Sequence, residues 1–269
     1  MELKKIAAEI RGKVVELSHS GRTPHLGSSL SCADIIAALY WDILKVDPRD
    51  PENCDRDRFI LSKGHAVTTL YVALAMRGFF PESEFNRYSQ LDSCLPEHPS
   101  PNCVPGIELA TGSLGHGLSV GLGIAMANRI QGNDGRVFVL LSDGECNEGS
   151  IWEAALLAPA QKLERLCVLV DFNKWQATGR SEEVTSLEPF EQKFSAFGWE
   201  SARIDGHDTE AILEELRDFP RTSGKPLAII CDTIKGKGIA KMEDDNNWHY
   251  RIPTAEEVVD AKRELALVE

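Results

Sequence analysis

Two solidly apolar segments of the chain each end abruptly at an acidic residue. Residues 137–141 run directly into Ser-Asp-Gly, and residues 166–170 run directly into Asp-Phe-Asn. Neither segment alternates between apolar and polar positions, which is typical of parallel strands that helices cover on both faces. A chain with such strands must bury them in a layered α/β fold, so this feature limits the possible architectures more than any other.

The remaining elements follow the same alternation of helix and strand. Three more short apolar runs are predicted strands, at residues 58–61, 201–204 and 227–231. Helical periodicity covers residues 3–18, 32–44, 66–77, 117–130, 151–163, 209–219 and 255–267. We therefore predict a doubly wound, mostly parallel sheet with helices on both faces. The 269 residues, of which 42% are hydrophobic, suffice for one such domain over residues 1–269.

Two of the helix starts carry the capping-box pattern, in which a hydroxyl residue is followed three positions later by glutamate. The pairs are Ser150 with Glu153 and Thr254 with Glu257. Each pair predicts that the hydroxyl and the glutamate satisfy free backbone N–H groups in the first turn of the helix. Glu153 then has a structural explanation that needs no role in catalysis.

The charge balance limits the partners. The chain has 42 acidic and 29 basic residues, which gives a net charge of −13. This excess opposes nonspecific binding to nucleic acid or anionic membranes and favours a small-molecule or protein partner. No apolar run approaches the roughly 18 to 20 residues that span a bilayer, and the first residues fit an amphipathic helix rather than a signal sequence. We therefore expect a cytoplasmic protein with no nucleic-acid or membrane partner.

The seven cysteines include no C-x-x-C pair. This pattern suggests neither a disulfide framework nor a zinc knuckle. Cys94, His98 and Cys103 could form part of a metal site, although no fourth ligand is evident. The alternative is a proline-rich loop that happens to contain thiols.

The two acidic strand ends are the first candidates for a functional site. Ligands of doubly wound sheets bind beyond the carboxyl ends of the strands, so the loops at Asp143 and Asp171 lie side by side if their strands are neighbours. Asp143 offers a carboxylate, Gly144 allows close approach of the backbone, and Asn173 offers an amide oxygen. A Mg²⁺ ion that also binds phosphate oxygens needs only one or two protein carboxylates. These residues fit a metal-bound phosphate, and equally fit acidic residues that only cap loops.

The spacing of these residues resembles a known pattern. Asp143-Gly144 and Asn173, thirty residues further on, are similar to the thiamine diphosphate fingerprint of the transketolase family. Other segments resemble motifs of that family in the same order: SHSGRTPHLGSSLS (18–31), LSKGHAV (61–67), LPEHP (95–99), TGSLGHG (111–117), TIKGKG (233–238) and WHYRIP (248–253). The resemblance spans nearly the whole chain.

The resemblance covers only the diphosphate-binding domain of the family, so the chain is similar to the N-terminal subunit of a split transketolase. It implies the thiamine diphosphate-binding fold and a Mg²⁺-dependent transfer of a two-carbon ketol unit from a ketose to an aldose. It also implies a second polypeptide that supplies the pyrimidine-binding domain, in an expected heterotetramer, with sugars or sugar phosphates as substrates. An apolar surface for that partner is expected around residues 111–117 and the helix after Glu148.

Residue by residue, the resemblance implies three groups of site positions. The magnesium ligands are Asp143, Asn173 and the main-chain carbonyl of Trp175. The cofactor lies against Ser28, His65, Gly112, Ser113, Leu114, Gly144, Glu148, Asn173 and His249. The catalytic side chains are His25, His98, His249 and Lys235. Imidazoles with a pKa near neutrality can donate and withdraw the protons of an alkoxide, and an ammonium group can stabilise a negative oxygen.

Four positions depart from the usual residues of the family. Ser142, Glu97 and Tyr250 stand where glycine is usual, and Trp175 stands where an aliphatic residue is usual. Glu97 and Tyr250 are expected to flank the substrate mouth, where they add a negative charge and a bulky phenol. The ordinary pentose phosphate substrates are therefore in doubt, and a specialised sugar pathway is an open alternative.

The other histidines have simpler explanations. His19 and His207 are predicted to be surface or capping residues. His116 follows a glycine in the segment at 111–117, where a structural hydrogen bond and a catalytic role are equally open.

Three alternative functions fit parts of the sequence. One is another thiamine diphosphate-dependent enzyme, such as a synthase that decarboxylates a 2-oxo acid. A second is a noncatalytic cofactor-binding subunit, against which the retained Asp143, Asn173 and loop histidines argue. A third is a dinucleotide-dependent oxidoreductase, suggested by the glycines of residues 112–123, although no clear strand precedes them.

Overall fold

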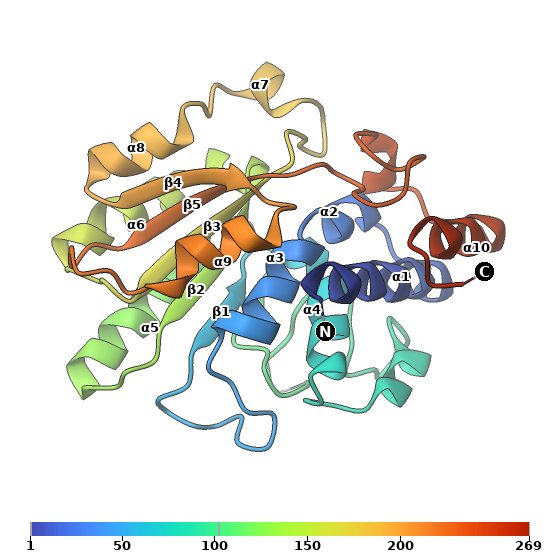
Figure 1. Ribbon diagram of the computed structural model, residues 1–269, viewed down its shortest axis with the longest axis horizontal. Coiled ribbons are helices and arrows are strands. Elements are labelled where there is room, and N and C mark those ends of the chain that lie inside the picture. Colours follow the sequence, from blue (N-terminus) through green and yellow to red (C-terminus); the bar gives the residue numbers. More distant parts are fainter. Residues whose placement is uncertain (1, 102, 269) are drawn as a thin grey trace.

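The computed structural model describes residues 2–101 and 103–268, and its centre is a five-stranded sheet (Figure 1). The strands are β1 (Arg58–Leu61), β2 (Val137–Ser142), β3 (Leu166–Phe172), β4 (Glu200–Asp205) and β5 (Leu227–Asp232). Their order is β1-β2-β3-β5-β4, and each neighbouring pair is parallel. The predicted doubly wound α/β sheet is confirmed.

Helices cover both faces of the sheet (Figure 1). They are α1 (Leu3–Gly21), α2 (Leu26–Ser31), α3 (Ala33–Ala38), α4 (Val67–Met76), α5 (Gly117–Gln131), α6 (Gly149–Ala160), α7 (Ser181–Val184), α8 (Phe190–Phe197), α9 (Thr209–Arg217) and α10 (Ala255–Glu264). The predicted helix at residues 32–44 is α3 followed by a π-helical turn, Leu39–Ile43. The periodicity does not predict α2, α7 or α8, because these helices are too short for an apolar pattern to repeat.

One of the two edge strands, β4, differs from its prediction. Every residue of β2 and β3 is buried, whereas every residue of β4 is at least partly exposed. Strand β4 lies at the edge of the sheet, where only β5 pairs with it. The expectation that all five runs are covered on both faces is therefore wrong for β4, whose Arg203 forms ion pairs with Glu188 and Asp232.

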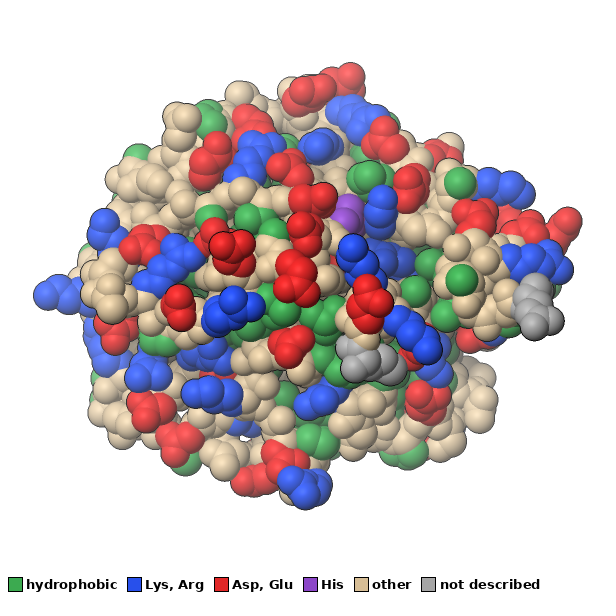
Figure 2. Space-filling model, in the orientation of Figure 1, with side chains coloured by type: hydrophobic (Ala, Val, Ile, Leu, Met, Phe, Trp, Pro, Cys, Tyr) green, Lys and Arg blue, Asp and Glu red, His purple; other side chains and the backbone are tan. Residues whose placement is uncertain are grey.

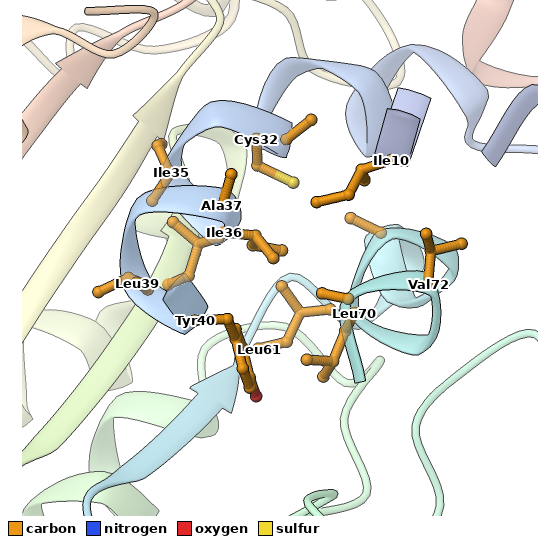
Figure 3. Packing of buried hydrophobic residues seen from close by; sticks show 14 of the residues in the cluster. Ile10, Cys32, Ile35, Ile36, Ala37, Leu39, Tyr40, Leu61, Leu70 and Val72 are labelled. Atoms are coloured by element: carbon orange, nitrogen blue, oxygen red, sulfur yellow. The ribbon is translucent and has the colours of Figure 1, made fainter. Parts of the chain in front are cut away.

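Successive strand residues point into two separate hydrophobic cores. Phe59 and Leu61 of β1 pack on the side of α1, α3, α4 and α9, whereas Ile60 packs on the side of α5, α6 and α8. Side chains alternate across a strand, so each central strand contributes to both cores. Figure 3 shows part of the first core, in which Ile10 of α1, Leu61 of β1 and Leu70 of α4 point into the same interior. Because the central strands are buried on both faces, they are held in place, and so are the starting points of the loops at their carboxyl ends.

Only one of the two predicted capping boxes is present. Thr254 and Glu257 form the expected reciprocal bonds at the start of α10. Helix α6 instead begins at Gly149, and the hydroxyl of Ser150 donates to the carbonyl of Gly115 at 2.9 Å. The capping box predicted for Ser150 and Glu153 is therefore wrong, because a tertiary acceptor takes the serine hydroxyl and ties α6 to the loop before α5.

The surface carries both signs of charge. Acidic and basic side chains are interspersed over the face in Figure 2 and do not gather by sign.

Within residues 2–101 and 103–268, no helix combines the length and the apolar character needed to cross a membrane. All seven cysteines carry free thiols.

Candidate active site

The carboxyl ends of β2 and β3 meet at a cavity of about 420 Å³, which we call the histidine cavity. Ser142 at the end of β2 pairs with Asp171 in β3, so the loops after these strands are neighbours, as predicted. The cavity is lined by His25, Ser28, His65, His98, Gly112, Leu114, Ser142, Gly144, Asn147, Glu148, Asn173, Trp175, Gln176, Ala177, Thr178 and His249.

Three of the predicted site residues do not line the histidine cavity. Ser113 is exposed, Asp143 is buried between two lining residues, and Lys235 is buried against His249. All the other predicted positions meet at this one cavity although they come from six separate loops. Their positions suit the predicted roles, and the roles themselves stay predictions.

Asp143 is a fully buried carboxylate without a cationic partner. One of its oxygens accepts from the hydroxyl of Ser181 at 2.6 Å and the other from the backbone N–H of Gly144 at 3.0 Å. Burial raises the pKa of Asp143 to about 6, and the nearby Asp171 carboxylate adds to this effect. No ion pair within the described residues includes Asp143. A divalent cation would relieve the cost of burying this charge.

Asn173 and Trp175 lie in the loop after β3 and face the same cavity. The amide oxygen of Asn173 accepts from the backbone N–H of Trp175 at 3.1 Å, and the left-handed Lys174 between them (φ 68°) turns the chain. Carboxylate, amide and main-chain oxygens are the hard ligands that Mg²⁺ prefers. The residues present therefore fit the predicted metal.

The alternative metal site is not formed. Among residues 2–101 and 103–268, no group of three or more His, Cys, Asp or Glu side chains is arranged to hold a metal ion. Cys94, His98 and Cys103 therefore do not make a metal centre there, and His98 lines the histidine cavity instead.

Asp171 does not cap a loop, contrary to the simpler explanation of the sequence. It lies inside β3, fully buried, and pairs with Lys63. The hydroxyls of Ser31 and Thr233 also donate to its oxygens. Lys63 is equally buried and donates to the carbonyl of Ser28 at 2.9 Å. This network joins the ends of β1, β3 and β5 to α2. Sequence reasoning missed Lys63, although it lies in the motif LSKGHAV two residues before His65.

Four histidines from separate loops surround one point of the cavity. The ring centroid of His25 lies 5.0 Å from that of His249, 5.5 Å from that of His65 and 5.9 Å from that of His98. His25 precedes α2 with a left-handed backbone (φ 68°), and its N–H donates to the carbonyl of His249 at 2.7 Å. The structure thus brings together the four loop histidines that were singled out from the sequence.

The expected near-neutral pKa is not found for three of these imidazoles, those of His25, His65 and His249. Burial lowers the pKa of His25 to about 4, helped by His98 and Lys235. Burial and Lys235 lower the pKa of His249 to about 3, and burial holds that of His65 well below its usual value. These rings are therefore neutral at pH 7. The expectation fails because burial and nearby cations both penalise an imidazolium.

Lys235 is the charged neighbour of this cluster. Its ammonium lies 3.2 Å from Nδ1 of His249 and 2.7 Å from the side-chain oxygen of Asn246. Burial and Lys63 lower the pKa of Lys235 to about 8. Because an ammonium can only donate, Nδ1 of His249 accepts and its ring proton is on Nε2.

The loop at residues 111–117 approaches the histidines through glycine. Gly112 has φ 136°, and a Cβ there would lie 2.7 Å from the His98 ring. The N–H of Gly115 donates to the buried Glu145 carboxylate at 2.8 Å, which also accepts from Ser62. Sequence reasoning missed Glu145, whose only signal is that it follows Asp143-Gly144.

The departures from the family pattern at Glu97 and Tyr250 lie outside the histidine cavity. Glu97 does not line it and accepts from the hydroxyl of Ser89 at 3.1 Å. Tyr250 packs its ring 4.7 Å from that of His249 and lines an adjoining hollow. The prediction that both residues flank the cavity mouth therefore finds support for Tyr250 alone.

Of the remaining histidines, His207 differs from expectation. His207 is not a surface residue: its Nδ1 lies 2.8 Å from the Asp34 carboxylate, and its Nε2 accepts from the N–H of Ile234. His19 contacts the carbonyl of Pro253 at 2.8 Å. His116 is exposed at the start of α5. None of the three lines the histidine cavity.

Known proteins resemble this chain in sequence over most of its length. It is 42% identical over 256 residues to one of the subunits of the apulose-4-phosphate transketolase of Phocaeicola vulgatus, covering 95% of this chain and 91% of that protein. It is 41% identical over 219 residues to a 6-deoxy-6-sulfo-D-fructose transketolase subunit from a Clostridium species, covering 81% and 80%.

Solved structures agree with the sequence relatives. The transketolase of Leishmania mexicana superposes with a TM-score of 0.93 at 29% identity, over 99% of this chain and 41% of that one. The chain thus spans about two fifths of the length of this solved transketolase. Residues 3–268 match the family described as transketolase, thiamine diphosphate binding domain. With its histidine cavity at the carboxyl ends of β2 and β3, the chain belongs to the transketolase family.

Proposed function

We propose that this chain is the N-terminal, diphosphate-binding subunit of a two-chain transketolase. The observation that carries the proposal is the cavity lined by four loop histidines, with the buried Asp143 between its lining residues Ser142 and Gly144. The covered lengths support the split arrangement, because the chain matches 91% of a relative that is itself named as one subunit and only 41% of a solved transketolase. In this proposal residues 1–269 act as one domain, in the cytoplasm.

The loops after β2 and β3 would hold the cofactor's diphosphate through Mg²⁺. Asp143, Asn173 and the carbonyl of Trp175 would be the metal ligands, and Gly144 would leave room for phosphate oxygens. Thiamine diphosphate supplies a carbon nucleophile that allows a C–C bond next to a carbonyl to break and re-form. Bound Mg²⁺ would favour the ionised form of Asp143 and so lower its raised pKa.

The histidines and Lys235 would handle protons and charge on the substrate. Neutral imidazoles can donate an N–H to a ketose oxygen and accept a proton at the other nitrogen. His249 would act through Nε2–H, because Lys235 occupies the side of Nδ1. The Lys235 ammonium would stabilise negative charge that reaches His249 or the substrate oxygen.

A second chain would complete the site. Val120 on α5 and Leu156 and Leu157 on α6 are exposed apolar side chains on helices that adjoin the loops at 111–117 and Glu148. We propose that this face, formed by α5 and α6, receives a pyrimidine-domain subunit in a heterotetramer. The word "subunit" in the names of the relatives supports such a partner.

The substrates are proposed as a ketose donor and an aldose acceptor. One relative is named for a phosphorylated sugar, apulose-4-phosphate, and the other for a sulfonated sugar, 6-deoxy-6-sulfo-D-fructose. We therefore propose a ketose with a terminal anionic group as the donor class.

Mixing experiments test this function. The purified chain should show no ketol transfer, and activity should appear when a candidate partner chain, thiamine diphosphate and Mg²⁺ are added, with light scattering showing a mixed assembly. A homo-oligomer of this chain that is active alone would refute the split enzyme. Pyruvate offered as donor in the same assay tests the alternative of a decarboxylating synthase, which predicts CO₂ release.

A further inference from the structure

Asp244 connects the loop of the proposed metal ligands to the loop of Lys235. Its backbone N–H donates to the carbonyl of Lys235 at 2.8 Å. Its carboxylate accepts from the indole N–H of Trp175 at 2.8 Å and from both terminal nitrogens of Arg180 at 2.7 and 2.6 Å. One residue thus contacts both loops, through its backbone on one side and its side chain on the other.

The contacts of Asp244 form a compact three-residue unit. The Arg180 guanidinium lies 3.8 Å from the centroid of the Trp175 ring, and the two residues pair as an antiparallel bridge across the 173–181 loop. Asp244 has a left-handed backbone (φ 58°), a conformation that aspartate and asparagine tolerate better than most residues. A bidentate carboxylate contact fixes geometry as well as adding attraction, so the loop is held in one orientation.

Asn246 makes a second connection between the same two loops. Its side-chain oxygen accepts from the Lys235 ammonium at 2.7 Å, and its side-chain N–H donates to the carbonyl of Ala177 at 3.2 Å. Asp244 and Asn246 both line the hollow beside Trp175 and Tyr250, and neither lines the histidine cavity. Their side chains reach the site through Trp175, Ala177 and Lys235.

We propose that Asp244 and Asn246 are positioning residues that hold the 173–181 loop and Lys235 in a fixed relation to each other. The proposal rests on the proposed function for the roles of Asn173, Trp175 and Lys235. The proposal implies that a shift of the 173–181 loop also shifts the ammonium of Lys235. Loss of either connection should therefore disturb the cofactor side and the substrate side of the cavity together.

The first test replaces Asp244 by asparagine, which keeps the left-handed backbone but loses the charge. Asp244→Asn should raise hydrogen exchange in the 173–181 loop of the purified chain about fivefold to thirtyfold, as expected for loss of a charge-assisted contact. Asp245→Asn is the matched control, because it makes the same charge change next door and the side-chain oxygen of Asp245 bonds only Asn247. Exchange in that control should stay within about twofold of the wild type.

The second test separates positioning from folding in the assembled enzyme. Asn246→Ala should lower kcat about tenfold while KM changes less, because Lys235 loses its nearest acceptor. Asn247→Ala is its control, since that side chain donates only to Asp245. Asn246→Asp, which keeps an acceptor for Lys235, should recover part of kcat.

The two tests distinguish a wrong connection from a wrong function. Unchanged loop exchange in Asp244→Asn, or full kcat in Asn246→Ala, would overturn the positioning roles while leaving the proposed ketol transfer intact. If the wild-type assembly showed no ketol transfer, the proposed function would fail, and the exchange experiment on the chain alone would still decide whether Asp244 holds the loop.

Discussion

The ends of β2 and β3 carry two fully buried aspartates in opposite electrostatic situations. Asp171 is paired with Lys63 and accepts from two hydroxyls, and these contacts outweigh the effect of burial and lower its pKa. Asp143 accepts from Ser181 and Gly144 but has no cation, and burial raises its pKa to about 6. Neighbouring strands therefore end in one carboxylate that a lysine neutralises and one that forms no ion pair within the described residues.

The same contrast appears between the two buried lysines. Burial alone would lower the pKa of Lys63, but Asp171 outweighs this effect and raises it. Lys235 contacts an amide and an imidazole in place of a carboxylate, and its pKa falls to about 8. Asp171 and Lys63 form an ion pair with each other and join the ends of the strands. Asp143 and Lys235, which form no such pair, lie against the histidine cavity. Such perturbed groups are common at functional sites.

The largest expected effect comes from removing the unsatisfied carboxylate. Asp143→Ala should abolish Mg²⁺-dependent binding of thiamine diphosphate, because it removes the only carboxylate among the proposed metal ligands. Isothermal calorimetry on the assembled enzyme measures this affinity, and circular dichroism of the variant checks that the fold survives. Unchanged affinity would sink the metal assignment and the contrast with Asp171.

His249 tests whether the neighbour of the unsatisfied lysine acts on substrate. His249→Ala should lower kcat/KM by roughly 10² to 10⁴, the usual range for a positioned acid or base. Cofactor affinity should be nearly unchanged, because the proposed metal ligands Asp143, Asn173 and Trp175 remain, although His249 is also expected to contact the cofactor. Steady-state kinetics and calorimetry together make the test, and normal turnover would mean that the loop beside Tyr250 has another use.

The contrast between the two aspartates could be predicted only in part. The solid apolar runs indicate parallel strands whose ends meet, and glycine and proline around the histidines indicate loops, so the members of the cavity are visible in the sequence. The partner of Asp171 is not, because Lys63 follows β1 and reaches Asp171 only when β1, β2 and β3 lie in that order. The order of the strands in the sheet cannot be seen in any local sequence pattern.

Two other failures have the same physical origin. Ser150 fits a capping box locally, but the carbonyl of Gly115 competes for its hydroxyl in the folded chain. The imidazoles have an ordinary pKa in isolation, but burial and Lys235 lower the pKa of His25 and His249 once the loops assemble. Local signals identify which residues take part, and long-range contacts decide their protonation and bonding.

Breaking the satisfied pair should cost stability more than binding. Lys63→Met leaves the Asp171 carboxylate buried without a cation, which typically costs about 3–5 kcal/mol. Urea denaturation of the purified chain at pH 7 measures the loss. The exposed pair of Arg165 and Asp134 provides a control, because Arg165→Met should cost no more than about 1 kcal/mol. Equal effects would show that burial of the Lys63 pair has no special weight.

The smallest effect concerns the sign of the pH dependence. The folded pKa of Asp143, about 6, lies above its unfolded value of 3.8, so its ionisation opposes folding as the pH rises through this range. Asp143→Asn should therefore stabilise the chain without metal or cofactor at pH 7, by up to about 3 kcal/mol, and the difference from wild type should vanish near pH 4.

For Asp171 the sign is reversed: its folded pKa is lowered, so its contribution is present above the unfolded pKa and is lost as the pH falls. Asp171→Asn should accordingly destabilise at pH 7. Urea denaturation of both variants across this pH range decides the matter, and a destabilised Asp143→Asn at pH 7 would mean that Ser181 and Gly144 already satisfy the ionised carboxylate.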